Sequence, residues 1–252
     1  MRNNVTLIMT RQPTTEFVWL QQKGKSYYEV IDDQEEEQKL FGTFDPATKK
    51  RVGGDKSARK AISGRWGTMA VVTGPVVTGA LRHMSATQGS SGSSATSKVE
   101  QITLAGQTVS LVTDGSSPVT TLAEFDTMER YRGNDNKDIG FVKLPEQPFK
   151  PYPLDIIINK KVAEFHEKMG IRAGHTGKCF LVRGHTVLRQ NKLPAGILVH
   201  EAPHPGWLTG CIAPRLKNHR EFSNDSQPCI KALNVIYKAM GTGRRCHLFI
   251  ID

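Results

Sequence analysis

Long hydrophobic runs are missing from this 252-residue sequence. The apolar stretch that ends at Met9 is too short for the hydrophobic region of a secretory signal peptide. No later segment reaches the length of a membrane span. We therefore expect a chain that is made in the cytoplasm without a standard signal peptide and that has no membrane span. A site of action in the periplasm or cell wall would then require a specialised export route.

Cysteine is scarce, and no two cysteines form a C-x-x-C pair. This spacing argues against a structural zinc knuckle. In an oxidising compartment four cysteines allow three complete disulfide pairings, and the sequence does not choose among them. The four are Cys179, Cys211, Cys229 and Cys246.

Dense basic runs interleaved with aromatic residues are also missing, although the net charge is +10. Residues 141–252 hold 17 Lys and Arg against 8 Asp and Glu, whereas residues 1–140 hold 17 against 16. No zinc-finger, helix-turn-helix or RNP pattern is present, so nucleic acid is not an expected partner. The uneven charge favours either solubility or attraction to an anionic polymer such as the carboxylate-rich cell wall.

Strand signals dominate the N-terminal part of the sequence. Short β-branched and aromatic runs separated by turn residues predict strands at 5–11, 17–22 and 26–32, arranged as an antiparallel meander. Residues 43–65 are polar and rich in Gly, Lys and Arg, which suggests a surface excursion.

The middle of the chain combines turn-forming residues with short apolar runs. Residues 99–113 predict a hairpin that turns at Ala105–Gly106. Residues 85–98 are a Gly/Ser tract with almost nothing to bury, which predicts a flexible loop. We expect the range 40–150 as a whole to be a long, loop-rich insertion.

The C-terminal third gives the clearest pattern. Apolar residues recur at helical spacing over 157–169 and over 226–241, where a proline lies in the first turn and Gly241 follows the last. Runs at 178–188, 195–200 and 245–252 predict strands.

These signals predict an α+β fold: one β-rich catalytic domain over residues 1–252, in which two helices pack on the strands. The catalytic segment is expected at residues 175–252.

The segment "HEAPH" at 200–204 spells the H-E-x-x-H signature of zinc peptidases. That chemistry needs both histidines on one face of a continuous helix. Pro203 and Pro205 disfavour a helix here, because proline removes a backbone donor and biases the preceding residue away from helical geometry. A zinc metallopeptidase is therefore the weaker hypothesis, although a non-helical metal site using His200, His204 and Cys211 stays open.

A cysteine nucleophile could use the same segment without a continuous helix. Cysteine attacks as the thiolate, so it requires a base and backbone N–H groups that can hold an oxyanion. A strand that ends at His200 and a loop that returns to Cys211 would bring a base and a nucleophile together, and Gly210 permits a close backbone approach. Glu201 would point away from His200 if the strand continued, which makes it a poor partner for the base.

The string "GILVHEAP…TGCIAP" resembles the active-site segment of the L,D-transpeptidase family, in which an apolar strand ends in histidine and leads to an S-H-G-C motif. Even closer in pattern are small domains of the same kind in phage and in toxins delivered by type VI secretion. The resemblance implies that Cys211 is the nucleophile, His200 the base and Gly210 the glycine of the motif. It implies no metal and no cofactor.

The resemblance covers residues 175–252 and has three departures, of which the first is a loop from His200 to Cys211 that is shorter than in the family. Thr209 stands where the family has histidine, and Ala213 stands where it has Arg or Asn. Arg215 is a candidate replacement for that arginine. The remaining residues expected to contact substrate are His204, Trp207 and Thr209, with Trp207 either stacking on substrate or anchoring its own turn.

The function implied is a cysteine transpeptidase or carboxypeptidase acting on peptidoglycan stem peptides. An antibacterial type VI secretion effector with an immunity protein as partner fits this expectation, and a non-catalytic phage or wall-binding module is the alternative.

Overall fold

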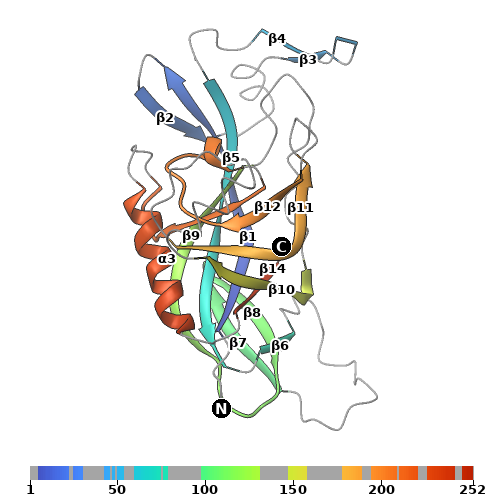
Figure 1. The fold of residues 1–252 in the computed structure, drawn as a ribbon, viewed down its shortest axis with the longest axis vertical. Coiled ribbons are helices and arrows are strands. Elements are labelled where there is room, and N and C mark those ends of the chain that lie inside the picture. Colours follow the sequence, from blue (N-terminus) through green and yellow to red (C-terminus); the bar gives the residue numbers. More distant parts are fainter. Residues whose placement is uncertain are drawn as a thin grey trace.

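Two long strands, β1 (Val5–Gln22) and β5 (Lys60–Thr73), run side by side along the longest axis of the molecule (Figure 1). They belong to a computed structural model of the protein. It describes residues 5–22, 25–30, 43–45, 47–48, 50–53, 60–74, 76–78, 98–130, 147–157, 178–188, 194–208, 210–220, 226–241 and 246–251.

Within these ranges, eight strands close into a barrel in the order β1–β14–β10–β11–β12–β13–β9–β5, which returns to β1. The pairings β1–β14 and β12–β13 are parallel, and the other neighbours in the ring are antiparallel. β2 (Lys25–Val30) extends β1 as a hairpin outside the ring. The other ring strands are β9 (Thr120–Arg130), β10 (Gln147–Ile157), β11 (Cys179–Leu188), β12 (Pro194–Val199), β13 (Ile212–Leu216) and β14 (Cys246–Ile251).

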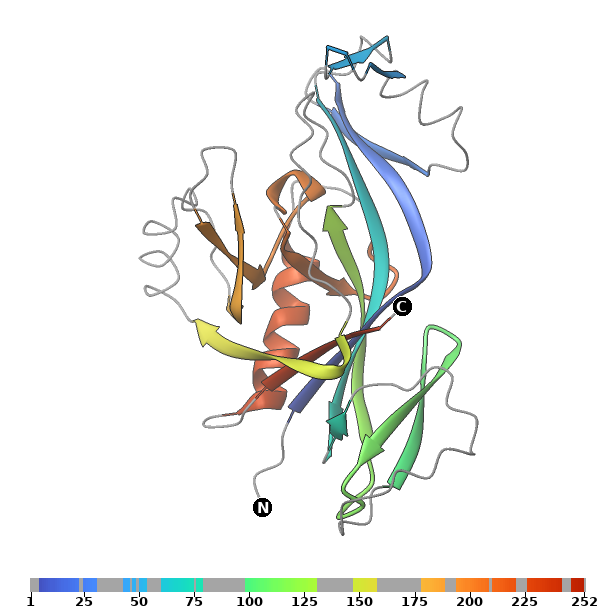
Figure 2. The ribbon, with the colours of Figure 1, turned by 90° about the vertical axis from the view of Figure 1, so that its right-hand side faces the viewer.

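The main core lies inside the barrel, and every ring strand contributes to it. On β1, Val5, Leu7 and Met9 alternate inward, as the two-residue period of a strand requires. The helix α3 (Gln227–Met240) packs its apolar face against these inward side chains. Figure 2 shows α3 lying behind β10 and β14. Its core residues are Ala232, Leu233, Ile236 and Met240.

The strand β1 is buried on both faces. Ile8 points outward and meets the hairpin of β7 (Lys98–Leu104) and β8 (Gln107–Thr113), which packs on the outside of the ring with β6 (Val76–Thr78). β3 (Thr43–Asp45) and β4 (Lys50–Val52) form a separate pair at the far end of the molecule (Figure 2).

Several sequence predictions are confirmed. The hairpin turns at Ala105 and Gly106, whose φ angles of 52° and 76° are the positive pair that a tight two-residue hairpin loop requires. The second predicted helix is α3, with proline in its first turn and Gly241 as its C-cap. The C-terminal strands are β11, β12 and β14, and the β-rich class is correct.

Other predictions are wrong. Residues 5–11 and 17–22 are one strand, β1, with a register shift between Thr10 and Thr15, rather than two strands of a meander. The range 40–150 is not wholly an insertion, because β5 and β9 within it are structural strands of the barrel. β5 also begins at Lys60, inside the expected surface excursion.

Some predictions lie outside the described residues. The structure describes one α-helix, and the predicted helix at 157–169 falls outside the described ranges except for Ile157, the last residue of β10. The Gly/Ser loop also lies outside them, apart from Lys98 at the start of β7. Among the described helices, none is long and apolar enough to cross a membrane.

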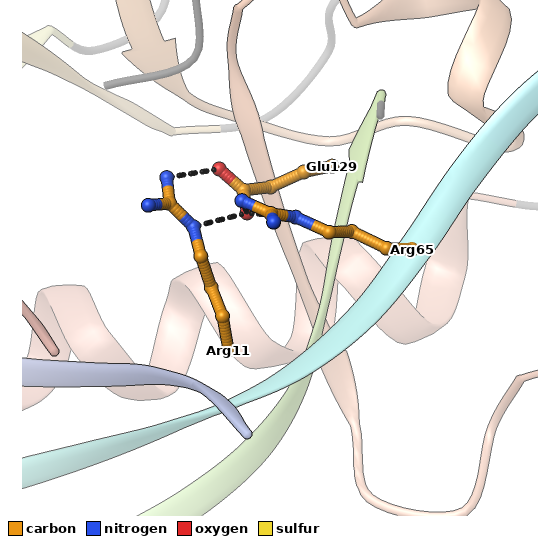
Figure 3. A network of polar contacts seen from close by, with 3 residues as sticks. All are labelled: Arg11, Arg65 and Glu129. Atoms are coloured by element: carbon orange, nitrogen blue, oxygen red, sulfur yellow. Dashed lines mark hydrogen bonds and ion pairs between the residues drawn. The ribbon is translucent and has the colours of Figure 1, made fainter. Parts of the chain in front are cut away.

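A buried charge network links β1, β5 and β9 (Figure 3). Arg11 donates from Nε and Nη2 to both carboxylate oxygens of Glu129, at 2.9 and 3.0 Å. Arg65 donates from Nε and Nη2 to Oε2 of the same carboxylate, at 3.1 and 3.0 Å. All three side chains are almost fully buried. One buried carboxylate is therefore shared by two guanidinium groups through charge-assisted hydrogen bonds.

We expect Glu129→Gln to lower the free energy of unfolding by about 3–5 kcal/mol, because it leaves two buried cations without their counter-charge. Urea titration followed by circular dichroism measures the change. Glu124→Gln is the matched control on the same strand, since Glu124 pairs with the half-exposed Lys217 and such a pair contributes about 1 kcal/mol or less. Equal losses in the two variants would contradict this role for the network.

Candidate active site

The candidate site is built on the connection between β12 and β13. The two strands are parallel and overlap at a single pair, Val199 with Ile212. The backbone N–H of His200 donates to the carbonyl of Ile212 at 2.9 Å. The chain therefore leaves β12 at His200, makes a loop and returns to the same level one strand away, at Cys211.

The loop contains no α-helix. Residues 200–204 are irregular, and Pro205–Trp207 form a short 3-10 helix, η1. His204 caps η1, since its Nδ1 accepts a hydrogen bond from the N–H of Gly206 at 3.1 Å. The helical geometry that a zinc peptidase requires is therefore absent from this segment, for the reason that its prolines predict. In the part of the chain that the structure describes, no group of three His, Cys, Asp or Glu residues could hold a metal ion.

An aromatic stack fixes the loop against the barrel. The ring of His204 lies parallel to the ring of Trp19 on β1, with centroids 4.0 Å apart and an interplanar angle of 4°. Trp207 meets His204 edge-on, with centroids 6.4 Å apart, and its own side chain is 43% exposed. His204 is thus largely committed to the loop, whereas Trp207 presents a large aromatic surface to solvent.

Arg215 holds the loop from β13. Its guanidinium donates to the carbonyls of Ala202 and Pro203, at 3.4 and 3.3 Å, and to that of His219 at 2.9 Å. The side chain is buried. The sequence predicted Arg215 as a substrate contact, which stays a prediction; in the structure its hydrogen bonds support the loop that carries the other site residues. Thr209 lies outside the described residues.

Cys211 directly precedes β13 and is 6% exposed. Its Sγ accepts a hydrogen bond from the N–H of Leu198 on β12, at 3.4 Å. Gly210 precedes it with a φ of 77°, in the left-handed region where a side chain is strained. The glycine that the sequence singled out is therefore required by the backbone turn into β13.

His200 is buried, and its Nδ1 lies 2.6 Å from the carbonyl oxygen of Glu201. A carbonyl oxygen only accepts, so Nδ1 carries the proton in this contact. In the neutral ring, Nε2 is then the unprotonated and basic nitrogen. Glu201 thus orients His200, but through its backbone rather than its carboxylate.

Two further cysteines surround the site, and the sequence did not identify them as neighbours. Cys179 on β11 and Cys229 on α3 belong to the same buried cluster as Cys211. The thiol of Cys229 donates to the carbonyl of Ala202 at 3.3 Å. Cys246 lies in the barrel core, and none of the four cysteines forms a disulfide bond. Burial raises the pKa of Cys179 to about 12, with smaller contributions from Cys211 and Glu201.

We expect Gly210→Ala to destabilise the fold by about 1–2 kcal/mol, because alanine is strained at this φ. Urea unfolding of the two proteins measures the difference. Gly206→Ala, in η1 where φ is not positive, serves as the control and is expected to cost less. A smaller loss for Gly210→Ala than for the control would be inconsistent with the strained turn.

We also expect Cys179 to resist alkylation in the folded protein. With a pKa of about 12, it remains a thiol at pH 8, where roughly one part in ten thousand is the reactive thiolate. Iodoacetamide labelling followed by peptide mass mapping, with and without urea, tests this expectation. Labelling of Cys179 at the same rate in the folded and unfolded protein would show that burial does not protect it.

Comparison with known proteins finds no match to this chain among family models, curated proteins or solved structures. The roles of the site residues therefore depend on the geometry of the loop and on the local resemblance of its sequence.

Proposed function

We propose that the protein is a cysteine-dependent enzyme of the L,D-transpeptidase type that acts on peptidoglycan stem peptides. One observation carries the proposal: the β12–β13 pairing brings the chain of His200 back beside Cys211. Their strands are hydrogen-bonded through His200 and Ile212, and Leu198 binds the sulfur. A histidine and a thiol at the ends of neighbouring strands support a base and nucleophile pair, the combination that catalysis by cysteine uses.

The proposed reaction has two steps. In the first, His200 takes the proton of the Cys211 thiol, and the thiolate attacks the carbonyl carbon of the stem-peptide bond. The carbon–nitrogen bond then breaks, the leaving amine takes the proton from the imidazolium, and a thioester remains on Cys211. In the second step an amine or water attacks the thioester and releases the cysteine, with His200 accepting and returning a proton.

Two features support a wall polymer as substrate. Trp207 presents an exposed aromatic surface next to the loop that carries His200. The net charge of +10 is concentrated in residues 141–252, the half that contains the site. An anionic wall would be attracted to this charge. Delivery as an antibacterial effector, with an immunity protein as partner, follows if the target wall belongs to another cell.

Muropeptide analysis tests the proposal. Sacculi treated with the wild-type protein are expected to yield altered stem peptides, and Cys211→Ala is expected to abolish the change because it removes the nucleophile. Cys246→Ala, which removes a buried thiol from the barrel core, should retain activity and controls for damage to the fold.

The same experiment separates the alternatives. A zinc hydrolase would lose activity with a chelator and keep it after thiol alkylation, which is the opposite of the expected pattern. A wall-binding module would sediment with sacculi without changing their composition. Identical products from wild type and Cys211→Ala would overturn the proposal.

A further inference from the structure

We infer that Arg130 is an electrostatic positioning residue that stabilises the thiolate of Cys211 and so favours transfer of the thiol proton to His200. The inference rests on the proposed function, because it gives that function's nucleophile a source of activation that the sequence motif does not contain. Arg130 is the last residue of β9 and is 8% exposed.

The strand register places Arg130 beside Cys211. β13 and β9 pair antiparallel, with Ala213 opposite Met128 and Ile212 opposite Glu129. β13 begins at Ile212, and continuing the same register by one residue puts Cys211, which directly precedes the strand, opposite Arg130. Residues directly opposite each other in an antiparallel pair have Cα atoms about 4.5–5.5 Å apart.

Both side chains lie on the same face of the sheet. Ala213 and Met128 belong to the buried cluster outside the barrel, and Cys211 belongs to it as well. Because side chains alternate along a strand, Arg130 shares the face of Met128, two residues earlier. Glu129 is on the other face, inside the barrel, where it binds Arg11 and Arg65.

The residues next to Arg130 limit the screening of its charge by water. On the next strand it is paired with Gly64, and Gly64 with Phe17. The ring of Phe17 packs directly over Gly64, where a Cβ would lie only 2.3 Å from the ring. A row of Cys211, Arg130, Gly64 and Phe17 therefore crosses four strands. A cation on such an apolar face acts on a nearby thiolate with little screening by water.

Other charged and titratable groups also belong to this neighbourhood. Arg130 stays protonated throughout the working pH range, so it favours the thiolate at every pH. Glu201 acts in the opposite direction, because its charge favours protonated thiols, as the raised pKa of Cys179 shows. The loop and the elements around it contribute charged and titratable groups that include His200, Glu201, His204, Cys179, Cys229 and Arg215, and the ion pair of Arg220 with Asp126 lies on the same face of β9.

The test is the pH dependence of Cys211 labelling by iodoacetamide, followed by peptide mass mapping that resolves each cysteine. We expect Arg130→Met to raise the midpoint of the labelling curve by about one pH unit or more, and to slow labelling at pH 7 by about tenfold. Arg130→Lys retains the positive charge and is expected to restore most of the wild-type curve. Arg130→Gln repeats the neutral substitution with a polar side chain, should the Met variant fail to fold.

Arg183→Met is the matched control. It removes a positive charge from an exposed ion pair with Asp155 on the outside of β10 and β11, and it should leave the midpoint unchanged. Circular dichroism confirms that each variant is folded before it is labelled. Equal midpoints for wild type and the neutral variants, or equal shifts for Arg130→Lys and Arg130→Met, would overturn the inference.

Labelling needs no substrate, so it separates this inference from the proposed function. A midpoint that depends on Arg130 supports the inference whatever the muropeptide result. If that dependence is found while sacculi remain unchanged, only the peptidoglycan substrate is rejected, and the activated thiol stands.

Discussion

The parallel pairing of β12 with β13 is the constraint on which the site depends. Parallel neighbours cannot be joined by a tight turn, because the chain must return to the end from which the second strand starts. Here the overlap is one residue pair, so the loop from His200 to Cys211 leaves and re-enters the sheet at the same level. The closure of the barrel and the proximity of His200 and Cys211 are thus two results of one pairing.

The two faces of the sheet at this level have opposite electrostatic arrangements. On the inner face, Glu129 accepts four hydrogen bonds from two arginines, and its single negative charge neutralises one of their two positive charges. On the outer face, Arg130 follows Met128 of the cysteine cluster by two residues and is paired with Gly64. Neighbouring residues of β9 therefore serve different purposes: one stabilises the barrel, and the next places a cation beside the thiol.

Local signals in the sequence predicted much of the fold. The Ala105–Gly106 turn, the ends of α3 and the strands β11, β12 and β14 all have signatures within a few residues of chain. The role of β9 had no such signature, because its inward residues include Thr127 and Glu129 rather than a regular apolar series. The carboxylate of Glu129 is buried against two arginines from distant strands, and that pairing is not visible in one stretch of sequence.

The residues of the candidate site likewise fall into two groups, those that are close in sequence and those that strand pairing brings together. His200, Gly210 and Cys211 lie in one segment, so their spacing could be read directly. Cys179 and Arg130 reach the site through the pairing of strands far apart in sequence. Their contribution follows from strand register, which composition and spacing do not determine.

The prolines that exclude a helix from the His200–Cys211 loop also make it suitable for holding a site. Proline restricts the backbone before folding, so the loop loses less conformational entropy when it is ordered. The stack of His204 on Trp19 and the bonds from Arg215 to the carbonyls of Ala202 and Pro203 then fix its position. A base and a nucleophile separated by a loop must be held in place before substrate arrives, since catalysis depends on their orientation. The same residues that spell a zinc motif in the sequence thus provide the rigidity that a cysteine site requires.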